Sequence, residues 1–364
     1  MKGIAQTMKV LGLVVSGVFA ALLVSCAPTA QKKSYEIVWP LPPEQPRLKF
    51  VDILQSVKDV EAEPGGFASA LFGEEASANL FKPYGVAVDK AGKVYVTDIG
   101  RVFIFDKKNK HLSFLGTEPG TGRLRIPIGV AVASDGRVFV TDTASDRVFV
   151  YDSKGSFMTA IGHEGEFESP SSLAIDEGRG RLYVADTRKH NVRAYSLKDF
   201  SLLMPIGERG DGPGQFNFPT NIAVDREGKI YVVDTNNFRV QIFSPDGLFL
   251  KEIGKIGDKP GSFARPKGIA IDSEGHVYVV DAAFQNFQIF DQDGNLLLFV
   301  GEGGTEPGQF SLPAGIAIDD DDRIYVVDQL NSRVQVFQYL GENWRKRQAV
   351  EKEPVKAPAQ EEKK

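Results

Sequence analysis

Carboxylates recur along this chain at a regular spacing, and they are the first residues to consider as chemical groups. Six aspartates each close a short apolar segment and stand 44 to 48 residues apart, at Asp98, Asp142, Asp186, Asp234, Asp281 and Asp328. Paired carboxylates can act as general acid and base, but an active site does not recur in six copies. We therefore expect each aspartate to accept hydrogen bonds from backbone N–H groups or a neighbouring arginine. The expected arginine partners are Arg147, Arg239 and Arg333.

Histidines are the other candidates, because imidazole is a common metal ligand. The chain has four, at His111, His163, His190 and His276. His163 and His190 are expected in loops on one side of the fold, where they could approach each other, whereas His276 is expected in a solvated turn. Two histidines without a third ligand do not make a zinc site. The sequence therefore predicts no metal and no cofactor.

The common catalytic motifs are absent. The sequence contains no Gly-x-Ser-x-Gly elbow, no P-loop and no His-Glu-x-x-His. The run Asp319 to Asp322 lacks the alternating ligand spacing of a calcium loop, so a charged turn is expected there. These observations favour a protein that is not an enzyme and has no catalytic residues.

The elements that must position these side chains come from a repeat. Six segments end at the six aspartates and read KPYGVAVDKAGKVYVTD, IPIGVAVASDGRVFVTD, SPSSLAIDEGRGRLYVAD, FPTNIAVDREGKIYVVD, RPKGIAIDSEGHVYVVD and LPAGIAIDDDDRIYVVD. In the fourth unit, four apolar runs separated by polar turns predict four antiparallel strands, over 221–225, 229–234, 239–243 and 248–254. A period of this length with four strands per unit predicts an all-β protein, a six-bladed β-propeller.

The sixth unit lacks its own fourth strand, because the chain turns charged after RVQVFQYLGENW. The missing strand is predicted at the other end of the chain, in residues 47–54 (RLKFVDIL), so that the first strand closes the ring and leaves no large exposed edge. The propeller is therefore expected over residues 47–340. The stretch 68–80 is extra relative to the other units, and is expected to be a short helix or flap, or a plain surface loop.

The pattern P-x-G-[IV]-A-[IV]-D, followed by [IV]-Y-V-x-D and N-x-R-[IV]-Q-[IV]-F, resembles the NHL repeat. The resemblance implies a six-bladed propeller that serves as a binding platform. Related six-bladed folds include lyases and lactonases, so the fold alone assigns no chemistry. Peptidyl-amidoglycolate lyases resemble this architecture but use several channel histidines, and the predicted innermost strands here contain none.

The N-terminus predicts export and lipidation. Residues 1–25 have lysines at 2 and 9 and then an apolar stretch, as in a signal peptide. They end in Leu23-Val24-Ser25-Cys26, which fits the lipobox of bacterial lipoproteins, with Cys26 as the acylated residue. The protein is therefore expected outside the cytoplasm on a lipid anchor. With Ala27 following the cysteine, the outer membrane is expected in a host with two membranes, and the cell membrane otherwise.

Charge and composition describe the remaining segments. After removal of Lys2 and Lys9 with the signal peptide, 41 basic residues face 48 acidic ones, which argues against a nucleic-acid surface. Residues 26–46 are rich in proline and predict a tether. Residues 341–364 are charged and predict a disordered tail. A monomeric propeller is expected.

A binding surface is expected on one side of the propeller. The proline face, as we name it, carries the proline that opens each unit and the loops between second and third strands; the opposite side, with the tight turns, is the turn face. Large apolar side chains beside basic ones are common anchors of protein interfaces. The predicted partner-binding residues are Tyr84, Arg188, Lys189, His190, Asn237, Phe238, Phe284, Gln285 and Leu330.

Two functions are compatible with this sequence. The first is a non-enzymatic extracytoplasmic platform that binds a protein or peptide-like partner of the cell envelope through the proline face. The alternative is a metal-dependent lyase or lactonase-type hydrolase with its site at the central channel.

Overall fold

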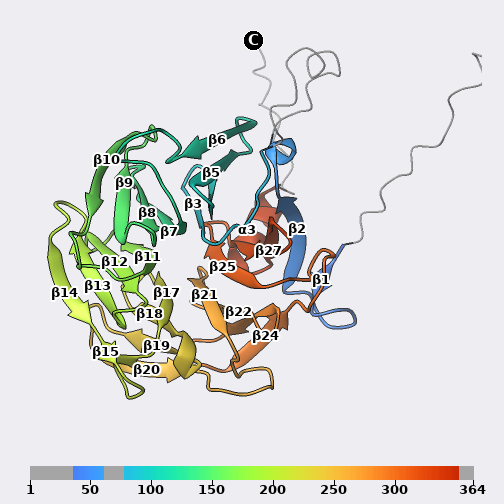
Figure 1. The fold of residues 1–364 in the computed structure, drawn as a ribbon. Coiled ribbons are helices and arrows are strands. Elements are labelled where there is room, and N and C mark those ends of the chain that lie inside the picture. Colours follow the sequence, from blue (N-terminus) through green and yellow to red (C-terminus); the bar gives the residue numbers. More distant parts are fainter. Residues whose placement is uncertain (1–35, 61–77, 352–364) are drawn as a thin grey trace, which may run out of the picture. The chain divides into compact units, whose positions relative to one another are not determined.

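Each repeat folds into a four-stranded antiparallel sheet, because β-branched and aromatic runs alternate with turns that contain Gly, Asp or Pro. The computed structural model describes residues 36–60 and 78–351. The chain divides into two units, Met1–Glu36 and Ile37–Lys364, and every element below belongs to the second. In that unit six sheets follow one another around a central axis, with the first strand of each repeat innermost (Figure 1).

The strands agree closely with the predicted repeat. Blade 1 contains β3 (Val86–Val88), β4 (Val94–Asp98), β5 (Arg101–Asp106) and β6 (His111–Leu115). Blade 2 contains β7 (Pro127–Val132), β8 (Val138–Asp142), β9 (Arg147–Tyr151) and β10 (Phe157–Ile161). Blade 3 contains β11 (Pro170–Asp176), β12 (Arg181–Asp186), β13 (Asn191–Ser196) and β14 (Leu202–Ile206).

The second half repeats the same order. Blade 4 contains β17 (Pro219–Val224), β18 (Ile230–Asp234), β19 (Arg239–Phe243) and β20 (Phe249–Ile253). Blade 5 contains β21 (Pro266–Ile271), β22 (Val277–Asp281), β23 (Asn286–Phe290) and β24 (Leu296–Val300). Blade 6 contains β25 (Pro313–Ile318), β26 (Arg323–Asp328) and β27 (Arg333–Tyr339). A short parallel pair, β15 (Glu208–Arg209) and β16 (Gln215–Phe216), lies in the crossover between blades 3 and 4.

The core lies between blades. Every residue of β4, β8, β18 and β22 is buried, since neighbouring sheets cover both faces of these strands. The buried apolar residues of the described chain form six clusters, one at each junction between adjacent blades. In the crossovers after blades 2 to 5, a glycine and a phenylalanine belong to this packing: a Cβ on Gly254 would lie 2.2 Å from the fully buried ring of Phe263. After blade 1, Leu124 takes the place of the phenylalanine.

The ring closes as the sequence predicts. Strand β2 (Leu48–Leu54) pairs antiparallel with β27 and completes blade 6, with Phe50 opposite Phe337 and Leu54 opposite Val334. A bulge between Phe50 and Asp52 turns Val51 outward, where 45% of its surface is exposed. Blade 6 thereby joins the two ends of the unit.

Two segments differ from prediction. Strand β1 (Val38–Trp39) pairs with β2 as a fifth strand, whereas the sequence placed residues 26–46 in a tether. The Trp39 ring explains the pairing, because it packs edge-on against Phe337 with ring centroids 5.5 Å apart.

The second difference is helix α3 (Glu342–Glu351), which forms where a disordered tail was expected from residue 341. The helix is held by acidic groups of the turn face. Glu274 accepts from the backbone N–H of Glu342 at 2.7 Å, and the Asn343 amide donates to Asp322 at 3.2 Å. These partners are distant in sequence, so composition alone could not reveal them.

Several predictions fall outside the described residues. They are the signal peptide, Cys26, the tether up to residue 35, residues 68–77 of the extra stretch, and the tail beyond residue 351. Among the helices of the described chain, none has the length and apolar character needed to cross a membrane.

Candidate functional site

The six repeated aspartates are framework groups, as predicted. Each accepts hydrogen bonds from backbone N–H groups of the crossover that enters its blade. Asp98 accepts from Phe81 at 2.6 Å and from Lys82 at 2.9 Å. The other backbone donors include Arg125 and Ile126 to Asp142, Glu168 to Asp186, Asn217 to Asp234, Ala264 and Arg265 to Asp281, and Ser311 to Asp328. Each carboxylate thus ties the second strand of its blade to the incoming chain.

Arginine joins this scheme in blades 4 and 6. Arg239 Nε lies 3.0 Å from Asp234 Oδ2, and Arg333 Nε lies 2.7 Å from Asp328 Oδ2. The predicted partnership of Arg147 is wrong, because Arg147 is exposed and Asp142 accepts from backbone N–H groups instead. Burial raises the pKa of the Asp234 carboxyl, since desolvation outweighs the bonds that favour its charged form.

Asn237 belongs to the same framework. Its side-chain amide donates to Asp234 Oδ2 at 2.7 Å and to the Gly210 carbonyl at 2.9 Å. Asn237 is one of the predicted partner-binding residues, but both hydrogens of its amide are already donated within the fold.

His163 and His190 do not form a metal site. His190 is buried, and its Nδ1 lies 3.3 Å from the carbonyl oxygen of Phe216 and 3.2 Å from the N–H of Phe218. The incoming crossover covers the His190 ring, so the structure leaves little of this predicted partner-binding residue exposed. His163 is exposed and lies beside Glu166 instead. The described residues contain no group of three His, Cys, Asp or Glu side chains that could hold a metal ion.

His276 also differs from the expectation of a solvated side chain. Its Nδ1 lies 2.8 Å from Asp272 Oδ2, and 21% of the side chain is exposed. The hydrogen bond that His276 donates to Asp272 raises the pKa of His276 above its usual value. The turn face near blade 5 therefore carries a half-buried ion pair.

The remaining predicted partner-binding residues differ in exposure. Leu330 is 61% exposed and Arg188 is exposed, so both are open to a partner. Phe238 and Phe284 are half-buried, and Phe238 packs against the apolar cluster between blades 4 and 5. Lys189 is also half-buried, and its ammonium donates to the Gly165 carbonyl. The proline face thus has an exposed outer part and a half-buried aromatic part.

The mouth of the central channel brings together Tyr84 and Lys267, which are 183 residues apart in sequence. The Lys267 ammonium lies 3.4 Å from the Tyr84 hydroxyl and 5.8 Å from the centre of its ring. Each follows a blade-opening proline, Tyr84 in blade 1 and Lys267 in blade 5. A small cavity of about 50 Å³ lies there. It is lined by Tyr84 and by residues of all six innermost strands.

Polar side chains replace glycine on one side of this mouth. In four blades the second residue after the blade-opening proline is glycine. At one of these, Gly85, a Cβ would lie 2.3 Å from the Ile128 carbonyl of the next blade. Blades 3 and 4 have Ser172 and Asn221 at this position instead. Asn221 lines the cavity, and its Oδ1 is buried and has no hydrogen-bond partner in the described part of the chain. A buried acceptor without a donor is costly, so this oxygen favours an incoming N–H or O–H group.

Hydroxyl groups beside Asn221 are already used by the fold. Thr187 donates to Ser171 at 2.8 Å, and Ser171 donates to the Thr220 carbonyl at 2.8 Å. Thr220 and Thr235 form a further hydroxyl pair at 2.7 Å. The open polar groups of the mouth are therefore Asn221 and the Lys267–Tyr84 pair. Sequence reasoning did not single out Asn221, although the departures P-S-S and P-T-N from P-x-G signal this position.

The turn face has wider hollows with acidic walls. One of about 300 Å³ is lined by turns of blades 4, 5 and 6, and Asp225, Asp272 and Asp319 contribute to it. These carboxylates accept hydrogen bonds from backbone N–H groups of their own turns, as Asp225 does from Lys229 at 2.9 Å. They stabilise the turns between the first and second strands.

Comparison with known proteins agrees with this geometry. A family model described as a 6-bladed beta-propeller matches residues 121–205 and 226–287, and the NHL repeat model matches residues 310–337. The chain is a six-bladed β-propeller, and residues 310–337 match the NHL repeat. NHL repeat-containing protein 3 of Mus musculus is 33% identical over 107 residues, which are 26% of this propeller's chain and 30% of the mouse protein. The match thus spans less than a third of that relative.

Solved structures share the fold of this six-bladed propeller. An auxiliary nutrient binding protein from Bacteroides thetaiotaomicron is 14% identical, with a TM-score of 0.57 over 72% of this chain and 70% of that one. A virginiamycin B lyase from Staphylococcus aureus is 13% identical, with a TM-score of 0.51 over 80% of this chain and 99% of that one. At these identities the likeness shows the fold alone, and the same fold carries both binding and catalysis.

Proposed function

We propose that this six-bladed propeller is a non-enzymatic binding platform outside the cytoplasm, which recognises a protein or peptide-like partner of the cell envelope through the proline face. The observation that carries the proposal is a contrast between polar side chains that are hydrogen-bonded within the fold and side chains that are exposed or lack such a partner. The repeated carboxylates serve the framework, whereas Arg188 and Leu330 are exposed, and the Asn221 oxygen at the channel mouth has no hydrogen-bond partner among the described residues. The fold is also that of a protein described as nutrient binding.

The chemistry of the face suits a peptide-like partner. Exposed leucine and half-buried phenylalanines offer apolar contacts, and Arg188 offers charged hydrogen bonds. At the channel mouth, the Asn221 oxygen can accept from a backbone N–H, and Lys267 can donate to a carbonyl or carboxylate. Amide groups supply both kinds of partner.

The test is a titration of the envelope partner captured by the intact protein. We expect Leu330→Ala and Arg188→Ala to weaken binding, with a true anchor costing about 2 kcal/mol or more. Leu248→Ala and Arg226→Ala are matched controls, because both residues are exposed on the turn face. Phe238→Ala and Phe284→Ala extend the series, and thermal melts separate their loss of packing from loss of contact. Weaker binding in the controls alone would show that the wrong face was chosen.

A metal assay tests the non-enzymatic part. We expect purified protein to lose its metal ions on dialysis. A stoichiometric ion that survives dialysis would instead favour the lyase or hydrolase alternative at the central channel.

Attachment to the envelope is part of the proposal, and Cys26 is the residue that would carry the lipid. Cys26→Ala should abolish incorporation of an acyl label and block removal of residues 1–25. Acyl label retained on the variant would contradict the anchor without touching the proposal for the proline face.

A further inference from the structure

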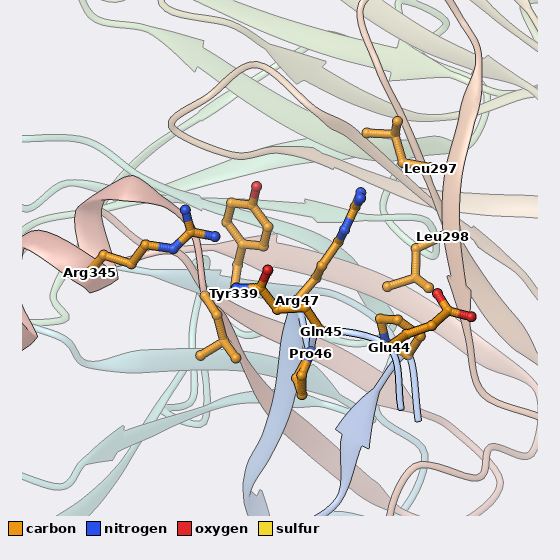
Figure 2. Close-up of a pocket in the computed structure, with 10 residues that line it drawn as sticks. Glu44, Gln45, Pro46, Arg47, Leu297, Leu298, Tyr339 and Arg345 are labelled. Atoms are coloured by element: carbon orange, nitrogen blue, oxygen red, sulfur yellow. The ribbon is translucent and has the colours of Figure 1, made fainter. Parts of the chain in front are cut away.

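A further pocket lies at the seam where β2 pairs with β27 and the two ends of the unit meet. We call it the seam pocket; its walls are the loop between β1 and β2, strand β24, the end of β27 and the first turns of α3 (Figure 2). Its volume is about 430 Å³, within the range of small-molecule sites. The pocket depends on β1 and α3, the two elements that depart from the repeated blade.

Two arginines whose side chains have no partner among the described residues line the seam pocket. Arg47 and Arg345 are both exposed. Their backbone N–H groups are bonded, to the carbonyls of Trp39 at 2.7 Å and Gly341 at 3.1 Å, but neither guanidinium has a hydrogen bond or ion pair to the described residues. By contrast, Arg333 donates to Asp328 and to three backbone carbonyls. The Arg333 side chain is therefore committed to the fold, whereas the guanidinium groups of Arg47 and Arg345 are available to a ligand.

The two guanidinium groups have a phenol beside them. Figure 2 shows the Tyr339 ring between the Arg345 and Arg47 side chains. Its hydroxyl is bonded to Glu274 at 3.1 Å, so it fixes the wall of the pocket. The Glu44 carboxylate also lines the pocket, and in Figure 2 it lies on the opposite side of the view from Arg345.

The other wall is apolar. Leu297 and Leu298 of β24, Leu340 after β27, and the prolines of the β1–β2 loop line the pocket. Guanidinium groups bind phosphate oxygens with paired hydrogen bonds, and a leucine wall favours an uncharged stem.

We propose that the seam pocket binds a phosphate ester, with the phosphate held by Arg47 and Arg345 and its organic stem against the leucines. Such a group is available on a soluble phosphate ester or on a phospholipid headgroup. If Cys26 carries a lipid, phospholipid headgroups are also nearby, because only nine residues separate Cys26 from Glu36. The pocket itself stands apart from the proposed partner binding, so either proposal can fail alone.

The experiment uses the chain from residue 26 onward with Cys26→Ser, so that neither the signal peptide nor an acyl chain contributes to membrane binding. Glycerol 3-phosphate is titrated by calorimetry, and phosphatidylcholine vesicles with and without phosphatidylglycerol are tested by flotation. We expect binding to at least one of these phosphate probes. Joint Arg47→Gln and Arg345→Gln substitution should weaken it by about tenfold or more.

Controls separate the pocket from general charge attraction. Joint Arg147→Gln and Arg226→Gln substitution removes the same charge from exposed sites in blades 2 and 4, and should leave binding unchanged. Binding of glycerol phosphate would support the soluble source, and binding of phosphatidylglycerol vesicles alone the lipid source. The proposal is overturned if no probe binds, or if the control pair weakens binding as much as the pocket pair. Leu330→Ala leaves the pocket intact and tests the proline face separately.

Discussion

Blades 4 and 6 contain the same polar network but draw on the chain in different ways. In both, the Asp carboxylate accepts from an asparagine, an arginine and a glutamine of the same blade. Blade 4 is continuous from Pro219 to Ile253, whereas blade 6 takes its outer strand from Leu48–Leu54. The comparison teaches that the second and third strands carry the network, and that the origin of the outer strand is free to change.

The networks differ where the outer strand could take part. In blade 4, Arg239 Nη1 also contacts Glu252 of β20 at 2.8 Å, whereas Arg333 Nη1 donates to the Thr305 carbonyl at 2.7 Å. Glu252 is 45% exposed, so this ion pair adds little to stability. The shared buried part of the network therefore decides its strength in both blades.

The largest effect is expected from removing the outer strand of blade 6. Deleting residues 47–57 takes away Leu48 and Leu54, which are at most 1% exposed, and leaves the edge of β27 unpaired. Burial of these two side chains alone contributes about 3–6 kcal/mol. Chemical denaturation should show at least this loss, or failure to fold. Deletion of residues 352–364 is the control, and equal unfolding midpoints for the two deletions would contradict the closure.

A smaller and equal effect is expected from Arg239→Ala and Arg333→Ala. Each variant leaves a fully buried carboxylate, Asp234 or Asp328, without its cation, which typically costs about 3–5 kcal/mol. The two losses, measured by urea unfolding, should agree within about 1 kcal/mol. A much smaller loss in blade 6 would mean that its network depends on the origin of the outer strand.

The turn face adds a pH-dependent difference between blade 4 and the junction of blades 5 and 6. His276 bonds to Asp272, whereas blade 4 has Lys229 at the same place in its turn. The bond to Asp272 raises the pKa of His276, Glu274 acts in the same direction, and Arg47 opposes them. Because the folded pKa lies above the unfolded one, the added stability is complete below the unfolded pKa and is lost as pH rises through the folded pKa.

This dependence should disappear in His276→Gln. Unfolding free energies measured from pH 5 to pH 9 should fall more steeply with rising pH in the wild type than in the variant, with an effect smaller than that of either arginine. Parallel profiles would exclude His276 as the titrating group. Lys229→Gln is the matched change in blade 4 and should leave the slope unaltered.

The smallest effect is expected in blade 2, where the motif arginine is outside the network. Arg147 is exposed, so Arg147→Ala should change the free energy of unfolding by no more than about 0.5 kcal/mol. A loss comparable to that of Arg239→Ala would show that exposure is a poor guide to the role of this position.

The sequence by itself determined the blade count, the strand order, the closing strand and the framework role of the six aspartates. These properties follow from local patterns, namely the alternation of apolar residues, the turn residues, and one polar group repeated at each strand end. The same repetition indicated which segments share a face. Exposed Leu330 and Arg188 were identified in this way.

Only the tertiary structure decided which side chains are open. His190 is covered by a crossover 26 residues away, and Tyr84 meets Lys267 across the ring. Strand β1 and helix α3, both assigned from composition to unstructured segments, are ordered by Phe337 and by the carboxylates of the turn face. The seam pocket exists because these additions meet there. The physical reason is the same in each case: the deciding contacts join residues that are distant in sequence, and a local pattern carries no record of them.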